Sequence, residues 1–149
     1  MSRILALFLA ICIQSVATLA QQKPCSDAES QQSEAEADSL RTWDALYRSY
    51  RLYAHCGNAS AAEGYSESVA GILVDHWQTL SRLSQLAKKD KDFRDFVLGH
   101  VDATLDMGDV KKIHANAIQH CPSALRNLCE DLKREAESAL QEDASVHKK

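Results

Sequence analysis

The chain of 149 residues has little glycine and proline, five and two residues, and its glycines are scattered. A loop that cradles phosphate groups needs clustered glycines, so the sequence excludes the usual nucleotide-binding loops. It also lacks Gly-x-Ser-x-Gly, the motif of a serine nucleophile at a strand-to-helix turn. Cys-x-x-Cys and His-Glu-x-x-His, spacings of common zinc sites, are missing too. Because these templates are absent, the sequence predicts that the protein is not an enzyme.

Three further absences narrow the class of protein. No long alternation of apolar and polar residues indicates β-strands. Basic residues are in deficit, with 17 Lys and Arg against 21 Asp and Glu and a formal net charge of −4 at pH 7. A nucleic-acid partner usually requires a basic face, so the composition argues against one. No second apolar run follows the N-terminal one, and we therefore expect no membrane span.

The N-terminus has the layout of a secretory signal peptide. Arg3 supplies a positive charge, an apolar run covers residues 4–16, and the small residues Thr18 and Ala20 precede a cleavage point. The run is shorter than the ~20 residues of a transmembrane helix. We therefore predict that residues 1–20 are removed and that the mature protein is secreted or periplasmic. An uncleaved N-terminal anchor is the alternative.

The mature chain would keep four cysteines, Cys25, Cys56, Cys121 and Cys129. An even number of cysteines in an exported chain predicts disulfides, and four cysteines allow three pairings. We favour a bond from Cys56 to Cys121 or Cys129, because each lies near a predicted helix end. A local Cys121–Cys129 bond is the alternative, and it requires the chain to fold back at Pro122. Cys25 would tether its segment to the domain or pair between two molecules in a homodimer.

The spacing of apolar residues predicts an all-α fold, a small irregular bundle of about five helices stapled by disulfides. At its centre we place a long helix over residues 60–89, whose apolar stripe extends from Tyr65 to Ala87. A stripe of this length must be covered by the other helices. The other helices are expected over residues 39–55, 90–105, 109–121 and 122–140.

The same pattern divides the chain into segments. Residues 21–38 are polar and acidic, so we expect a disordered linker there. The helical domain covers residues 39–140, and residues 141–149 are expected to form a disordered tail. Trp43 and Trp77 should lie in the core, because burying one large ring is worth ~2–3 kcal/mol.

Cationic and aromatic residues alternate in the first predicted helix, where Arg41, Arg48 and Arg51 are interleaved with tyrosines such as Tyr47. One interpretation is a surface for an anionic ligand or for the acidic patch of a partner protein. The other is a solvated face that covers aromatic rings. We carry these four residues forward as the candidate interaction surface.

Two histidines precede cysteines, His55 before Cys56 and His120 before Cys121. If the fold brought both pairs together, four nitrogen and sulfur ligands would suit a zinc ion. An oxidising compartment favours disulfides instead. We therefore predict no metal and no cofactor.

The layout of signal peptide, acidic linker, short helical bundle and two disulfides resembles that of many small exported bacterial proteins. Some of those are inhibitors, such as the immunity proteins that neutralise amidase toxins in the periplasm. The likeness is one of shape, and no motif carries it. Our first hypothesis is a non-enzymatic protein-binding module, of inhibitor or immunity type, with an unknown protein partner. The alternative is a small-ligand or metal-binding sensor that uses the His–Cys pairs at helix ends.

Overall fold

The computed structural model describes residues 23–57, 59–146 and 148. In that part of the chain the predicted all-α fold is confirmed, with seven α-helices and no β-strand. The predicted signal peptide, residues 1–20, lies outside the described residues. The helices are α1 (Asp27–Ala37), α2 (Trp43–Tyr53), α3 (Ala59–Asp75), α4 (Leu80–Lys89), α5 (Lys91–Gly99), α6 (Met107–Gln119) and α7 (Arg126–Val146). Three 3-10 turns connect them, η1 (Ala54–Cys56), η2 (Trp77–Thr79) and η3 (Ser123–Leu125).

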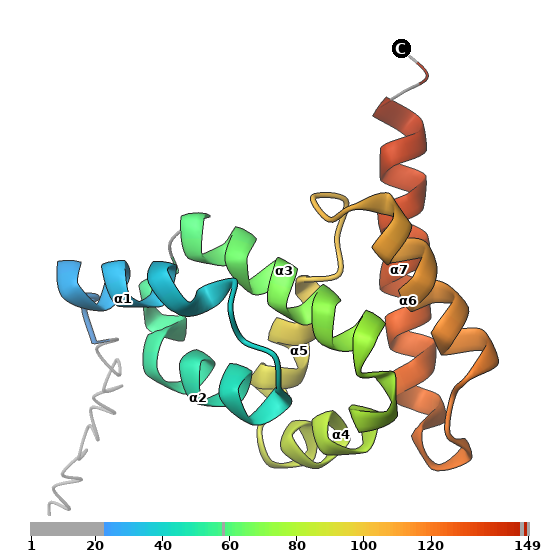
Figure 1. Cartoon of the computed structure of the whole chain (residues 1–149), viewed down its shortest axis with the longest axis horizontal. Helices are drawn as coiled ribbons and strands as arrows, with labels where there is room; N and C mark the ends of the chain where they lie inside the picture. The colour runs from blue at the N-terminus through green and yellow to red at the C-terminus, as the bar shows by residue number, and fades with distance from the viewer. Residues whose placement is uncertain (1–22, 58, 147, 149) are drawn as a thin grey trace, which may run out of the picture.

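Helix α3 lies across the middle of the molecule (Figure 1). Helices α1 and α2 lie at one end of α3, and α6 and α7 pair at the other end. Helices α4 and α5 pack against each other. The buried face of α3 includes Val69, Ile72 and Leu73, each fully inaccessible to solvent. Among the described helices, none is both long enough and apolar enough to cross a membrane.

The long helix predicted over residues 60–89 is wrong as a single element. Helix α3 ends at Asp75, the turn η2 follows, and α4 starts a new direction at Leu80. The hydroxyl of Thr79 donates to the carbonyl of His76 at 2.7 Å, which closes the turn locally. The apolar stripe continues across the break because Trp77 and Leu80 are both buried. Periodicity alone therefore could not reveal the change of direction.

Residues 27–37 form helix α1 in place of the disordered linker expected over residues 21–38. A capping box starts the helix: the Ser26 hydroxyl accepts from the Glu29 amide, and the Glu29 carboxylate accepts from the Ser26 amide at 3.1 Å. At the other end Ala37 is fully buried. The Ser68 hydroxyl of α3 donates to the carbonyl of Ala37 at 2.6 Å. Capping and packing against α3 thus order a segment whose composition indicated disorder.

The C-terminal helix is also longer than predicted. Helix α7 continues to Val146, so the expected disordered tail over residues 141–149 is helical for most of its length. Residues 147 and 149 lie outside the described part of the chain. The side chain of Leu140 packs partly buried against the core, which gives the extra turns an anchor.

The core expectation for the two tryptophans is confirmed. Trp43 in α2 and Trp77 in η2 are both buried. The largest fully buried side chains come from different helices, which makes one continuous core; they include Leu46, Ile72, Leu83, Phe93, Ile113 and Leu132.

The disulfides are Cys25–Cys56 and Cys121–Cys129. The favoured bond from Cys56 to the C-terminal pair was therefore wrong, and the local Cys121–Cys129 alternative is what the structure has. Helix α6 ends before Pro122, and the chain folds back until the two alpha carbons lie 6.0 Å apart. Cys25 therefore tethers its segment to the domain, which is one of the two roles predicted for it.

Candidate functional site

An apolar pocket of about 300 Å³ opens beside η1, between α3 and α5. We call it the aromatic pocket. Its lining residues are Tyr53, Ala54 and Gly57 around η1, Ala61, Ala62 and Tyr65 of α3, Phe96 of α5, and His100 at the C-cap of α5. The ring of Tyr65 meets Phe96 edge-on with centroids 5.2 Å apart, and the Phe96 and His100 rings lie 4.2 Å apart. Three packed rings therefore give the pocket a firm wall.

The polar groups of the aromatic pocket are few and uncharged. Nδ1 of His100 lies 2.7 Å from the carbonyl oxygen of Phe96. Because a carbonyl only accepts, Nδ1 carries the proton and Nε2 is left as an acceptor. Burial lowers the pKa of His100, so the ring is neutral at neutral pH. Burial likewise raises the pKa of Tyr65, whose hydroxyl shares a hydrogen bond of 2.7 Å with Ser49.

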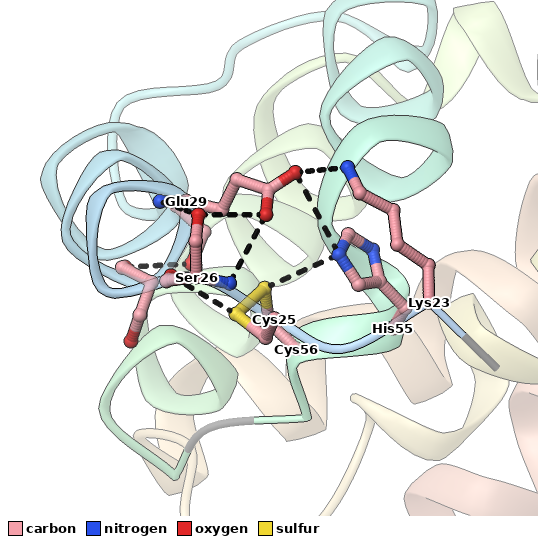
Figure 2. Close-up of polar contacts among 8 residues, drawn as sticks. Lys23, Cys25, Ser26, Glu29, His55 and Cys56 are labelled. Carbon is pink, nitrogen blue, oxygen red and sulfur yellow. Dashed lines mark hydrogen bonds and ion pairs between the residues drawn. A yellow bond between two sulfur atoms is a disulfide. The ribbon is translucent and has the colours of Figure 1, made fainter.

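A second group of reactive side chains surrounds the Cys25–Cys56 disulfide (Figure 2). Figure 2 shows the His55 ring beside the disulfide and the carboxylate of Glu29, with one contact to each. Nε2 of His55 lies 3.8 Å from Sγ of Cys56 and 3.7 Å from Oε1 of Glu29. The ammonium group of Lys23 pairs with the same carboxylate oxygen. We call this group the N-terminal cluster: Lys23, Cys25, Glu29, His55 and Cys56.

Local structure fixes the members of the N-terminal cluster. Cys25 directly precedes the cap of α1, and Glu29 lies in the first turn of that helix. Oε2 of Glu29 is held by the backbone amide and hydroxyl of Ser26, at 3.1 and 2.8 Å. Hydrogen bonds from Lys23 and then from Ser26 lower the pKa of Glu29 to about 2, so its carboxylate is ionised.

Among residues 23–57, 59–146 and 148, one group of three potential metal donors lies close together, and it belongs to the N-terminal cluster. Sulfur atoms of Cys25 and Cys56 and a ring nitrogen of His55 all lie within 4.8 Å of one another. In the oxidised protein the two sulfurs are bonded to each other.

The two predicted His–Cys pairs do not form a common site. Cys121 is bonded to Cys129 rather than facing Cys56. His120 is exposed, and its backbone carbonyl accepts a hydrogen bond of 3.0 Å from the indole of Trp77. Of the two histidines, the structure brings only His55 to a group of donors.

The candidate interaction surface, which lies on α2 and just before it, is partly engaged within the molecule. Nη1 of Arg51 lies 3.1 Å from Oδ2 of Asp90, and the hydroxyl of Tyr47 donates to the same oxygen at 3.3 Å. Nη1 of Arg41 donates to the carbonyl of Asp38 at 2.6 Å. Arg48 is exposed. That this surface binds a partner stays a prediction.

Sequence reasoning missed two parts of these sites. The role of Glu29 beside His55 depends on a bond between Cys25 and Cys56, which spacing did not indicate. The capping pattern of Ser26 and Glu29 was visible in the sequence and would have placed a helix there. Phe96 and His100 lie within the helix predicted over residues 90–105, but no pocket was predicted there, because the pocket forms only where α5 packs against the segment of η1 and α3.

Comparisons with known proteins add no relative: no protein-family model matches the chain, and no curated protein or solved structure matches it significantly.

Proposed function

We propose that this protein is an exported, non-enzymatic protein-binding module, of inhibitor or immunity type. Its aromatic pocket would receive one apolar side chain of the partner protein. The observation that carries the proposal is the pocket itself, with its wall of Tyr65, Phe96 and His100. A buried aromatic anchor in such a pocket is the usual source of most binding energy in protein complexes.

The size and chemistry of the pocket favour a side chain over a metabolite. A volume of about 300 Å³ is at the lower end of the range for small-molecule sites, ~300–1,000 Å³. A metabolite would present several polar groups. The pocket offers the acceptor nitrogen of His100 and the already bonded hydroxyl of Tyr65. An apolar side chain with one hydrogen-bond donor, such as an indole, would fill the pocket and donate to the His100 nitrogen.

Export is supported by the N-terminal layout of residues 1–20 and by two disulfides, which persist in oxidising compartments. In that setting the exposed side chain of Arg48 on α2 would add attraction for an acidic partner.

The pocket proposal is tested by filling the pocket. Ala62 lines it and is exposed, so Ala62→Phe blocks the pocket without disturbing the core. Ala144 is also exposed and lies near the end of α7, which makes Ala144→Phe a matched control. We expect indole, used as a probe, to shift the NMR signals of Phe96 and His100 in the native chain and in the control. Ala62→Phe should abolish the shifts.

The partner is then sought among exported proteins of the host, with the same two variants as bait. A protein retained by the native chain and by Ala144→Phe, but lost with Ala62→Phe, would support the proposal. Equal retention by all three chains, or no indole shift at Phe96 and His100, would contradict it.

A further inference from the structure

We propose that the N-terminal cluster is a second, conditional site: when a dithiol reduces the Cys25–Cys56 disulfide, Cys25, His55, Cys56 and Glu29 bind one zinc ion. The proposal is independent of the aromatic pocket. It rests on the positions of four donor atoms from two segments, the start of α1 and the turn η1.

The two distances from the His55 ring to its neighbours already resemble those of a tetrahedral zinc site. With Zn–S of ~2.3 Å, Zn–N of ~2.0 Å and Zn–O of ~2.0 Å, the edges of the tetrahedron are ~3.5 Å for N–S and ~3.3 Å for N–O. Nε2 of His55 lies 3.8 Å from Sγ of Cys56 and 3.7 Å from Oε1 of Glu29. The two sulfurs must move apart, from 2.03 Å to ~3.8 Å. Cys25, His55 and Cys56 alone have donor atoms that all lie within 4.8 Å of one another, so the Glu29 side chain must also move towards the sulfurs to become the fourth ligand.

The ligand types also suit zinc. Two thiolates, one imidazole and one carboxylate are all common zinc ligands. Two thiolates and a carboxylate carry three negative charges, which a divalent ion and the nearby ammonium group of Lys23 balance. The capping hydrogen bonds from Ser26 orient the Glu29 carboxylate before any ion arrives.

The chemistry balances with one co-reactant. A dithiol donates two electrons and two protons to the Cys25–Cys56 bond and leaves as its own cyclic disulfide, and two protein thiols result. Zinc then displaces both thiol protons and is bound through the sulfurs. Both cysteines are half-buried rather than enclosed, so a reductant can reach them. The ion would join α1 to η1 in place of the covalent bond.

Cobalt(II) is the probe, because tetrahedral thiolate sites give it intense visible bands that an octahedral aqueous ion lacks. The full mature chain is reduced, freed of reductant, and titrated with cobalt and then zinc. We expect one cobalt ion per chain with tetrahedral bands, displaced by zinc, and no such bands in the oxidised chain.

Variants assign the ligands. Cys25→Ala/Cys56→Ala should lack the bands, whereas Cys121→Ala/Cys129→Ala should keep them. His55→Ala should weaken zinc affinity by more than about 100-fold, since even loss of an outer-shell contact costs ~10–100-fold. The matched control is His114→Ala, which removes a histidine paired with Glu137 at 3.2 Å on other helices and should change nothing.

Glu29→Gln keeps a side chain able to complete the capping box. We expect it to weaken zinc affinity by about tenfold without unfolding α1, which circular dichroism checks. Absence of tetrahedral bands in the reduced native chain would overturn the proposal. Bands that survive in Cys25→Ala/Cys56→Ala, or equal affinity in His55→Ala and His114→Ala, would also overturn it.

Discussion

The two disulfides lie in regions that are stabilised in different ways. Cys25–Cys56 joins residues 31 apart in sequence and links the start of α1 to η1. Cys121–Cys129 joins residues 8 apart and closes the turn between α6 and α7. The described part of α1 buries only Ser33 and Ala37. Helices α6 and α7 bury a set of mostly apolar side chains, namely Val110, Ile113, Ala117, Leu128, Cys129, Leu132, Ala136 and Ala139.

The difference shows what each bond contributes. Helix α1 has too little apolar surface to hold itself against α3, so the long-range cross-link replaces a hydrophobic face. The α6–α7 pair has such a face already, and its short cross-link adds to an existing core. The predictions below test this division, from the largest expected effect to the smallest.

The first prediction concerns the core beside the second disulfide. Trp77 is buried and its indole donates to the carbonyl of His120 at 3.0 Å. Trp77→Ala should lower the free energy of unfolding by about 3–5 kcal/mol, because it leaves a cavity between η2 and the α6 end. Urea unfolding followed by circular dichroism measures the loss. Trp77→Phe keeps most of the ring and should cost less. A loss below ~1 kcal/mol in Trp77→Ala would place this side chain at the surface.

The second prediction compares the two cross-links directly. The free energy of unfolding of Cys121→Ala/Cys129→Ala is measured with Cys25–Cys56 oxidised and again with this bond reduced. The same two measurements on Cys25→Ala/Cys56→Ala give the contribution of Cys121–Cys129. A chelator is present throughout. From the lengths of the closed loops, oxidation should raise the free energy of unfolding by about 4 kcal/mol for Cys25–Cys56 and by about 2.5 kcal/mol for Cys121–Cys129. A larger value for the short loop would contradict our view of the two regions.

The third prediction uses two glycines of α3. A Cβ added at Gly64 would lie 2.8 Å from the Cβ of Ala37 and 3.0 Å from the backbone nitrogen of Asp38. Gly64→Ala should therefore push α1 away from α3 and lower the free energy of unfolding by about 1–3 kcal/mol. A Cβ added at Gly71 meets no atom within 4 Å. Gly71→Ala, in the same helix, should therefore raise the free energy of unfolding by about 0.5–1 kcal/mol. Thermal unfolding of both variants measures the contrast, and equal effects would contradict the tight α1–α3 contact.

The fourth prediction is a pH dependence that arises in the aromatic pocket. Burial lowers the pKa of His100 below its ordinary value, so the unfolded chain binds this proton more readily than the folded chain does. The contribution of neutral His100 to the free energy of unfolding is therefore complete above pH ~6.5, and it is lost as the pH falls towards the pKa of His100 in the folded chain. Unfolding of the native chain and of His100→Gln across this range should show a steeper loss for the native chain. Parallel curves would contradict the assignment.

Much of the fold follows from the sequence, because apolar periodicity reports which residues face a core. The all-α class and the burial of Trp43 and Trp77 were predicted in this way. Composition was a poorer guide for residues 27–37. Capping by Ser26 and Glu29, a close contact of Ala37 with Gly64 and the Cys25–Cys56 bond together order a helix that buries little apolar surface.

The candidate sites were less accessible to prediction. The even number of cysteines in an exported chain predicted disulfides, but their pairing depends on the turn after α6 and on the docking of α1. Neither feature leaves a periodic signal. The break at residues 76–79 escaped for the same reason, since Trp77 keeps the phase of the apolar stripe. The aromatic pocket depends on three elements meeting, which local patterns do not specify.

Hydrogen exchange of the native and the fully reduced chain, in the presence of a chelator, tests the central claim most directly. Reduction opens both disulfides at once, so the two regions report on their own packing. We expect amides of α1, residues 27–37, to lose protection on reduction while those of α6 and α7 retain theirs. Loss of protection in α6 and α7 with α1 still protected, or equal loss in both regions, would contradict the account.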